Sequence, residues 1–144
     1  MSNHAGAKSI TTQILVPQLI DQSAANTLSS SADMKGYDRV KLVYNLGAMV
    51  NGSTLSTWAV ESNESNLGNS TNITNAALVN VANTGNNNVY VIDIHRPSKR
   101  YVGVMVDAVS ANITSLSVLA ERFRGTGVVP PTSPAQQYVS VQAN

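Results

Sequence analysis

The sequence predicts an all-β protein, an antiparallel β-sandwich of jelly-roll-like topology with extended N- and C-terminal arms. Three observations lead to this prediction. Short segments alternate apolar and polar residues with the two-residue period of a strand, and turn-forming residues separate these segments. No segment shows the apolar spacing of a helix. We expect about seven to nine short strands in one domain, because 144 residues suit a single hydrophobic core.

The N-terminal part of the chain is polar. Residues 1–9 are small and hydrophilic, and we predict a flexible arm there, ahead of a sandwich domain at residues 10–124. Residues 14–16 are expected to form a short strand that ends near Pro17. Serine, threonine and asparagine dominate residues 22–33, and their side chains compete with the backbone for hydrogen bonds, which disfavours a helix interior. A polar edge strand is the expected structure.

Residues 39–46 are the clearest amphipathic strand in the chain. Alternate apolar residues give this segment one face that suits the core. The opposite face carries Arg39 and Lys41, which we expect to be solvated. This strand therefore anchors the predicted core.

The segment that follows is expected to form one strand and then long loops. Residues 54–61 alternate again, and we predict that Trp58 and Val60 share a buried face. The asparagine-rich residues 62–88 favour turns and local side-chain hydrogen bonds, so we expect surface loops there. Within them, residues 76–81 suit either a short strand or one helical turn, and we favour the strand.

The most regular stretch of the chain is predicted to be a three-strand antiparallel meander. In residues 89–95 apolar and polar residues alternate as in a strand with one solvent-exposed face. Pro97 then requires a turn, because proline fixes φ and cannot donate a ladder hydrogen bond. Residues 100–108 resume as the return strand of a hairpin, and residues 116–121 alternate as a third strand.

The composition changes after Arg122. Residues 124–134 contain three prolines and two glycines, which a packed sheet cannot accommodate. We therefore predict a proline-rich, extended C-terminal arm over residues 125–144. Near its end Tyr138, Val139 and Val141 lie in an alternating segment that could add a strand to an exposed sheet edge.

Composition limits the possible functions. The chain has no cysteine, which excludes disulfides and thiolate metal sites. Charged residues make up 12% of the chain and the net charge is +1, too weak a field for a dedicated nucleic-acid-binding protein. No apolar run approaches the length of a membrane helix, and the N-terminus lacks the apolar core of a signal peptide. We expect neither nucleic acid nor a membrane as a partner.

Few residues suggest chemistry. Asp93 and His95 share a strand face and could supply two metal ligands, but a solvated face beside a turn is the favoured interpretation. Glu61 and Glu64 lie near Trp58 and could form a sugar-cleaving pair, although an exposed strand end is favoured. No G-x-S-x-G motif and no glycine-rich phosphate loop is present. We therefore predict no catalytic, cofactor-binding or metal-binding residue, and no enzyme.

Two sets of cations remain. Arg96, Lys99 and Arg100 cluster at the tip of the predicted hairpin, and Arg39 and Lys41 share one strand face. Solubility alone could explain both sets. The functional alternative is a small basic patch that docks on an acidic partner surface.

Three segments resemble a family of small tailed-phage and prophage head proteins. They are GYDRVKLVY at residues 36–44, WAVESNES at 58–65 and KRYVGV at 99–104, and the resemblance extends over residues 36–122. It implies a capsid decoration (cement) protein, a jelly-roll-like sandwich that sits on the outer shell and clamps neighbouring capsomers. The family has no catalytic motif. The asparagine-rich residues 66–88 depart from the shorter loops expected of it.

The sequence thus predicts a structural virion protein without a cofactor, located on the outer surface of a bacteriophage capsid after synthesis in the bacterial cytoplasm. Its expected partners are the major capsid protein and further copies of itself, as a homodimer or homotrimer. The alternative is a carbohydrate- or host-receptor-binding module of a phage fibre, using the Asn-rich loops and Tyr90, Tyr101 or Tyr138. The candidate contact residues are Arg39, Lys41, Arg96, Lys99, Arg100, Tyr138, Val139 and Val141.

Overall fold

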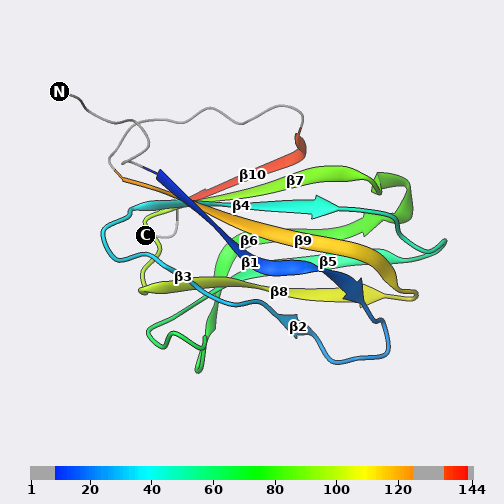
Figure 1. The fold of residues 1–144 in the computed structure, drawn as a ribbon, viewed down its shortest axis with the longest axis horizontal. Helices are drawn as coiled ribbons and strands as arrows, with labels where there is room; N and C mark the ends of the chain where they lie inside the picture. The colour runs from blue at the N-terminus through cyan, green and yellow to red at the C-terminus, as the bar shows by residue number, and fades with distance from the viewer. Residues whose placement is uncertain (1–8, 125–134, 143–144) are drawn as a thin grey trace.

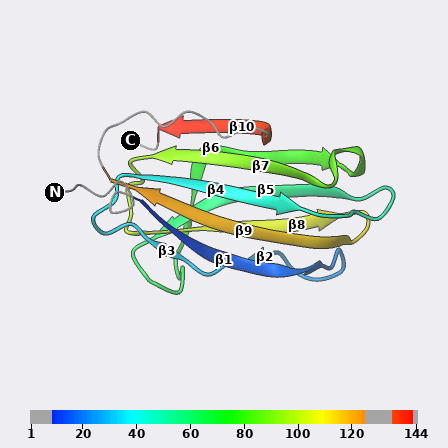
Figure 2. The same cartoon turned by 45° about the horizontal axis from the view of Figure 1, so that its top comes forward.

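Two β-sheets pack face to face in this computed structural model, which describes residues 9–124 and the strand at residues 135–142 (Figures 1 and 2). The first sheet has the order β1 (Ser9–Ile20), β9 (Ile113–Phe123), β4 (Arg39–Leu46), β7 (Asn88–His95) and β10 (Ala135–Gln142). The second has the order β2 (Thr27–Leu28), β8 (Tyr101–Val109), β5 (Thr54–Ser62) and β6 (Thr71–Ala82), and β3 (Ala32–Asp33) also pairs with β8. The predicted all-β sandwich is confirmed.

The strand pairing is that of a jelly roll. The first half of the chain pairs with the second half in reverse order, so that β5 pairs with β6, β4 with β7, β2 and β3 with β8, and β1 with β9. Two further antiparallel pairs, β4 with β9 and β5 with β8, complete the sheets. β10 is an addition to this pattern, because it pairs with β7 in parallel.

The predicted three-strand meander is wrong. β7 and β9 belong to the first sheet and β8 belongs to the second, so the chain changes sheets at each of the two turns between them. Alternation of apolar residues specifies that a segment is a strand and which face is buried, but not which strand lies beside it. The turn at Pro97 therefore connects the two sheets instead of closing a hairpin within one sheet.

The core lies between the sheets and contains most of the apolar positions that alternation predicts. Trp58 and Val60 are the exceptions. Leu55 and Ala59 of β5 belong to the core, whereas Trp58 is half-buried and Val60 lies outside the core cluster. Thr57, between Leu55 and Ala59 on the same face, hydrogen-bonds its hydroxyl to the core Tyr44 hydroxyl at 3.0 Å. Trp58 and Val60 therefore lie on the outer face, because a shift of one residue exchanges the two faces of a strand.

Several predicted loops and strand ends also differ in the structure. β1 continues through Pro17 to Ile20, which an edge strand allows because bulges interrupt its pairing with β9. The polar segment at 22–33 forms β2 and β3, which pair only with β8, in keeping with the expected edge position. The predicted strand at 76–81 is confirmed within β6, which begins earlier than expected and shortens the asparagine-rich loops.

The predicted edge strand near the C-terminus is confirmed. β10 pairs with β7 so that Tyr138 lies opposite Val91 and Val141 opposite Ile94. The strand lies inside the range predicted as an extended arm, while the rest of that range up to residue 134, residues 143–144, and residues 1–8 lie outside the described part of the chain. Among the described residues, no helix is long and apolar enough to cross a membrane.

Candidate functional site

Every lysine and arginine in the described part of the chain lies toward one end of the sandwich, which we call the basic end. They are eight of the nine in the sequence, the exception being Lys8. The β3–β4 turn, the start of β4, the β7–β8 turn and the end of β9 meet there, as the pairing of Arg39 with both His95 and Phe123 requires. The loops at the opposite end, among them 47–53 and 110–112, contain none of the described cations. The eight residues are Lys35, Arg39, Lys41, Arg96, Lys99, Arg100, Arg122 and Arg124.

Two of these cations are not solvated, contrary to the prediction. Arg39 is 4% exposed and Lys41 is 1% exposed, on the face of β4 that points away from the core. Arg39 forms a two-pronged ion pair with the fully buried Asp93 of β7, and its Nε donates to Asp93 Oδ1 at 2.8 Å. Lys41 lies opposite Asp93 on one neighbouring strand and Glu121 on the other. Both cations also lie near the Phe123 ring, at 5.7 and 5.8 Å from its centroid.

This buried charge cluster is structural support for the basic end. A buried arginine is tolerated when a carboxylate accepts its hydrogen bonds in a two-pronged geometry, and Asp93 provides this geometry from across the sheet. His95 Nε2 lies 3.6 Å from Asp93 Oδ2. Asp93 is therefore already engaged by a cation, and the described residues include no group of three or more potential ligands that could hold a metal ion.

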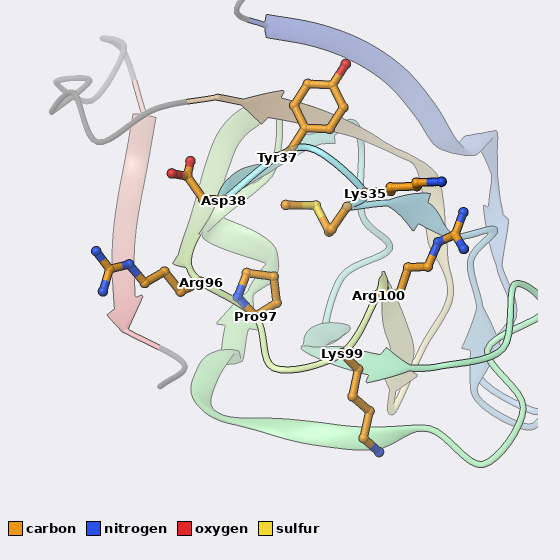
Figure 3. A pocket seen from close by; sticks show the side chains of 8 residues that line it. Lys35, Tyr37, Asp38, Arg96, Pro97, Lys99 and Arg100 are labelled. Atoms are coloured by element: carbon orange, nitrogen blue, oxygen red, sulfur yellow. The ribbon is translucent and has the colours of Figure 1, made fainter.

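The remaining predicted cations surround a pocket between two turns (Figure 3). Its volume is about 490 Å³, and Lys35, Arg96, Lys99 and Arg100 contribute to its lining. Two backbone hydrogen bonds join the β3–β4 turn to the β7–β8 turn. Met34 N–H donates to the Arg100 carbonyl at 2.8 Å, and Arg96 N–H donates to the Asp38 carbonyl at 2.7 Å. The pocket lies between these two connections.

Glu61 holds the β7–β8 turn in place. The carboxylate is buried and accepts hydrogen bonds from the Ser98 backbone N–H at 2.9 Å, the Ser98 hydroxyl at 2.5 Å and the Lys99 backbone N–H at 3.3 Å. Glu64, by contrast, is exposed and accepts a bond from Asn69. The expectation that both carboxylates form an exposed strand end is wrong for Glu61, and a Glu61 that is committed to the turn does not suit a sugar-cleaving pair.

Arg100 is paired with Asp33 on the second sheet. Its Nε and one terminal nitrogen each donate to one Asp33 carboxylate oxygen at 2.9 Å. Asp33 also accepts a hydrogen bond from the Lys35 backbone N–H at 3.0 Å. The Arg100 guanidinium, followed by the Lys35 N–H, lowers the pKa of Asp33 from 3.8 to about 2.

This pairing predicts a small, pH-dependent stability difference. Because the pKa of Asp33 is lower in the folded state, the pair stabilises the fold above pH 3.8 and loses this contribution as the pH falls through about 2. The side chains are 39% and 47% exposed, so we expect Asp33→Asn to cost about 1 kcal/mol or less at neutral pH. Urea denaturation at several pH values should show this difference vanish toward pH 2; a constant difference would assign it to another contact.

Tyr37 stacks with Arg122 near the end of β9 and with Arg124 just after this strand. The guanidinium carbons of Arg122 and Arg124 lie 5.1 and 5.0 Å from the centroid of its ring. Arg122 also donates to the Asp33 carbonyl at 2.7 Å and to the Thr12 hydroxyl at 2.8 Å. These contacts attach the β3–β4 turn to β1 and β9, so one wall of the pocket is fixed to the first sheet.

The aromatic residues considered for carbohydrate binding are only partly available. Tyr90 is buried and donates its hydroxyl to the Gly85 carbonyl at 2.7 Å, while Tyr101 is half-buried beside Arg100. Trp58, which was expected in the core, shares the outer face of the second sheet with Met105. The side chains of Tyr138, Val139 and Val141 lie outside the described part of the structure, so their role as anchors stays a prediction.

No protein-family model matches this chain, and no curated protein matches it either. Sequence reasoning missed the part of the pocket that the β3–β4 turn supplies, including Met34, Lys35 and Tyr37. A signal was present, because residues 35–38 have the composition of a turn and directly precede the most amphipathic strand. The sequence did not indicate that this turn would meet the one at Pro97.

Proposed function

We propose that this chain is a structural virion protein, a decoration or cement protein that binds the outer surface of a bacteriophage head and bridges major capsid subunits. The observation that supports it most is the gathering of the described lysines and arginines at one end of a rigid sandwich whose sequence carries a net charge of only +1. At least five carboxylates, Asp33, Asp38, Glu61, Asp93 and Glu121, lie at the same end, so the eight cations leave a modest positive excess there. This excess favours orientation of the basic end toward an acidic surface. Because three strand segments resemble phage head proteins, we take this acidic surface to be the capsid shell.

The fold suits a bridging role that involves no chemistry. Two connected turns present the pocket, and the buried Arg39–Asp93 pair and the Glu61 carboxylate hold them on the sheets. A rigid surface loses little conformational entropy on binding. A shell offers many equivalent sites, so a homodimer or homotrimer placed at a symmetry axis would bind by several weak contacts at once.

Two lysines on the pocket rim provide the test. We expect the double variant Lys35→Gln, Lys99→Gln to bind shells that lack the protein about tenfold more weakly than the native chain, because the charge contacts of the exposed Lys35 and the half-buried Lys99 are lost. The measurement is co-sedimentation with purified shells at increasing salt, together with the temperature at which decorated particles release their genome. Native binding should weaken with salt more steeply than binding of the variant.

The matched control is Asn51→Asp, Thr114→Glu, which lowers the net charge by the same amount with two exposed residues at the opposite end. This control should bind as the native protein does. Equal weakening by both variants would show that net charge alone matters and would contradict an oriented basic end. Absence of shell binding by the native protein, combined with selective binding to a glycan array, would instead favour the carbohydrate-binding alternative.

A further inference from the structure

We propose that the pocket at the basic end receives one apolar side chain, of leucine or phenylalanine size, from an acidic segment of the partner protein. This inference rests on the proposed function and specifies the kind of capsid segment that would be bound. The partner segment would place its apolar residue between the two turns and its flanking carboxylates on the surrounding lysines. Three features of the pocket lead to this assignment.

The first feature is an apolar interior. Met34 is buried at the base of the β3–β4 turn, and Pro97 lies across from it on the β7–β8 turn; both line the pocket. Figure 3 shows the Pro97 ring in the middle of the lining, with the long charged side chains directed away from it. A volume of about 490 Å³ is at the lower end of the range for binding sites and leaves room for one large apolar side chain and its backbone.

The second feature is the arrangement of charge around this interior. Lys35 and Arg100 extend to one side in Figure 3, Lys99 extends downward, and Asp38 and Arg96 lie on the opposite side. Arg100 is already matched by Asp33. Lys99 donates its ammonium to the Thr71 hydroxyl at 3.1 Å, a neutral acceptor that leaves its charge unmatched by that contact. Lys35 and Lys99 are therefore the cations best placed to receive carboxylates, and the Asp38 carboxylate disfavours an acidic group on its own side. The ligand should be acidic mainly on the side of the two lysines.

The third feature is that the pocket is formed before binding. The Met34–Arg100 and Arg96–Asp38 backbone hydrogen bonds join its two walls, and Tyr37 N–H closes the β3–β4 turn on the Met34 carbonyl at 2.9 Å. Little ordering is required when an apolar group enters such a site, so most of its burial energy contributes to affinity. An apolar centre surrounded by polar groups is the usual arrangement of an interface anchor.

Three capped pentapeptides test the assignment. The first is acetyl-Glu-Glu-Leu-Glu-Glu-amide, the second has serine in place of leucine, and the third has glutamine in place of every glutamate. Binding to the full chain is measured by NMR titration of the backbone amides. We expect the first peptide to bind at least about tenfold more tightly than either of the others, because the serine peptide loses the burial of the leucine side chain and the glutamine peptide loses the charge contacts with the two lysines. The shifted amides should include Lys35, Tyr37 and Lys99 and exclude Asn51 and Ser110.

The double variant Lys35→Gln, Lys99→Gln should reduce the affinity for the first peptide and leave that for the third unchanged. Equal binding of the leucine and serine peptides would overturn the inference, since it would indicate a charged surface without an apolar anchor. Failure of all three peptides to bind, with native binding to shells retained, would overturn the inference and leave the proposed function in place. Tight, pocket-specific peptide binding without shell binding would support the pocket and contradict the proposed function.

Discussion

Asp93→Ala should lower the free energy of unfolding by about 3–5 kcal/mol, the largest effect we expect from any polar substitution in the described part of the chain. The substitution leaves the Arg39 guanidinium, which is 4% exposed, without the carboxylate that accepts two hydrogen bonds from it. A buried charge that loses its partner retains its full desolvation cost. Urea denaturation should show this loss as a lower midpoint. The slope of the unfolding free energy against denaturant concentration should stay the same, which would indicate that unfolding exposes the same amount of surface.

Two further variants separate the ion pair from other effects at this position. The double variant Arg39→Met, Asp93→Leu should recover part of the lost stability, because apolar side chains can replace a buried ion pair beside the Phe123 ring, although the buried Lys41 still loses the carboxylate opposite it. Asp107→Ala removes a half-exposed carboxylate on β8 and should change stability by no more than about 0.5 kcal/mol. A loss below about 1 kcal/mol for Asp93→Ala would contradict the assignment of the pair as a major support.

Glu61→Ala should cost about 1.5–3 kcal/mol and also weaken binding to shells, because it removes the acceptor that holds the β7–β8 turn. Ser98 and Lys99 lose their shared partner, and the turn that carries Lys99 and Arg100 should become mobile. Backbone amide hydrogen exchange at Ser98 and Lys99 would report the loosening directly.

Glu64→Ala is the control for this prediction. Glu64 belongs to the same segment but is exposed, and its carboxylate accepts a hydrogen bond from the Asn69 side chain, while its backbone bonds to Ser62 and Leu67 do not depend on the carboxylate. Its replacement by alanine should therefore leave both exchange in the turn and shell binding unchanged. If Glu61→Ala reduced stability without increasing exchange at Ser98 and Lys99, the carboxylate would support the core and not the turn. The pocket would then not depend on it.

The basic end shows how far local sequence can specify a site. Arg96, Lys99 and Arg100 were recognisable as a cluster because they are adjacent in the chain and flank a proline. Arg39 and Lys41 were assigned to a solvated face because the alternation of apolar and polar residues places them on the side of the strand opposite the core. A strand face that points away from the core can still be buried, as it is here. Asp93 lies 54 residues from Arg39, and the sequence contains no local sign that the two meet.

The order of the strands in the sheets could not be predicted from the sequence, for a related reason. Val102, Val104 and Val106 were correctly assigned to the core, although the predicted partner of their strand was wrong. The side-chain period belongs to each strand by itself, whereas pairing depends on contacts between distant segments and on the closure of both sheets. A strand with apolar residues on both faces leaves the buried face ambiguous. On β5, Trp58 lies on one such face and Leu55 and Ala59 lie on the other, and the face of Leu55 and Ala59 packs in the core.

Local sequence alone specifies that this chain forms short strands, which of their faces are mostly apolar, and that one turn concentrates positive charge. These properties depend on residues that are neighbours along the chain, where steric preference and periodicity act. Three properties depend on the folded chain: the strands pair as a jelly roll, Arg39 and Lys41 are desolvated, and two distant turns enclose a pocket. Desolvation and enclosure arise from groups brought together across the fold, so their energies depend on partners that no local pattern identifies.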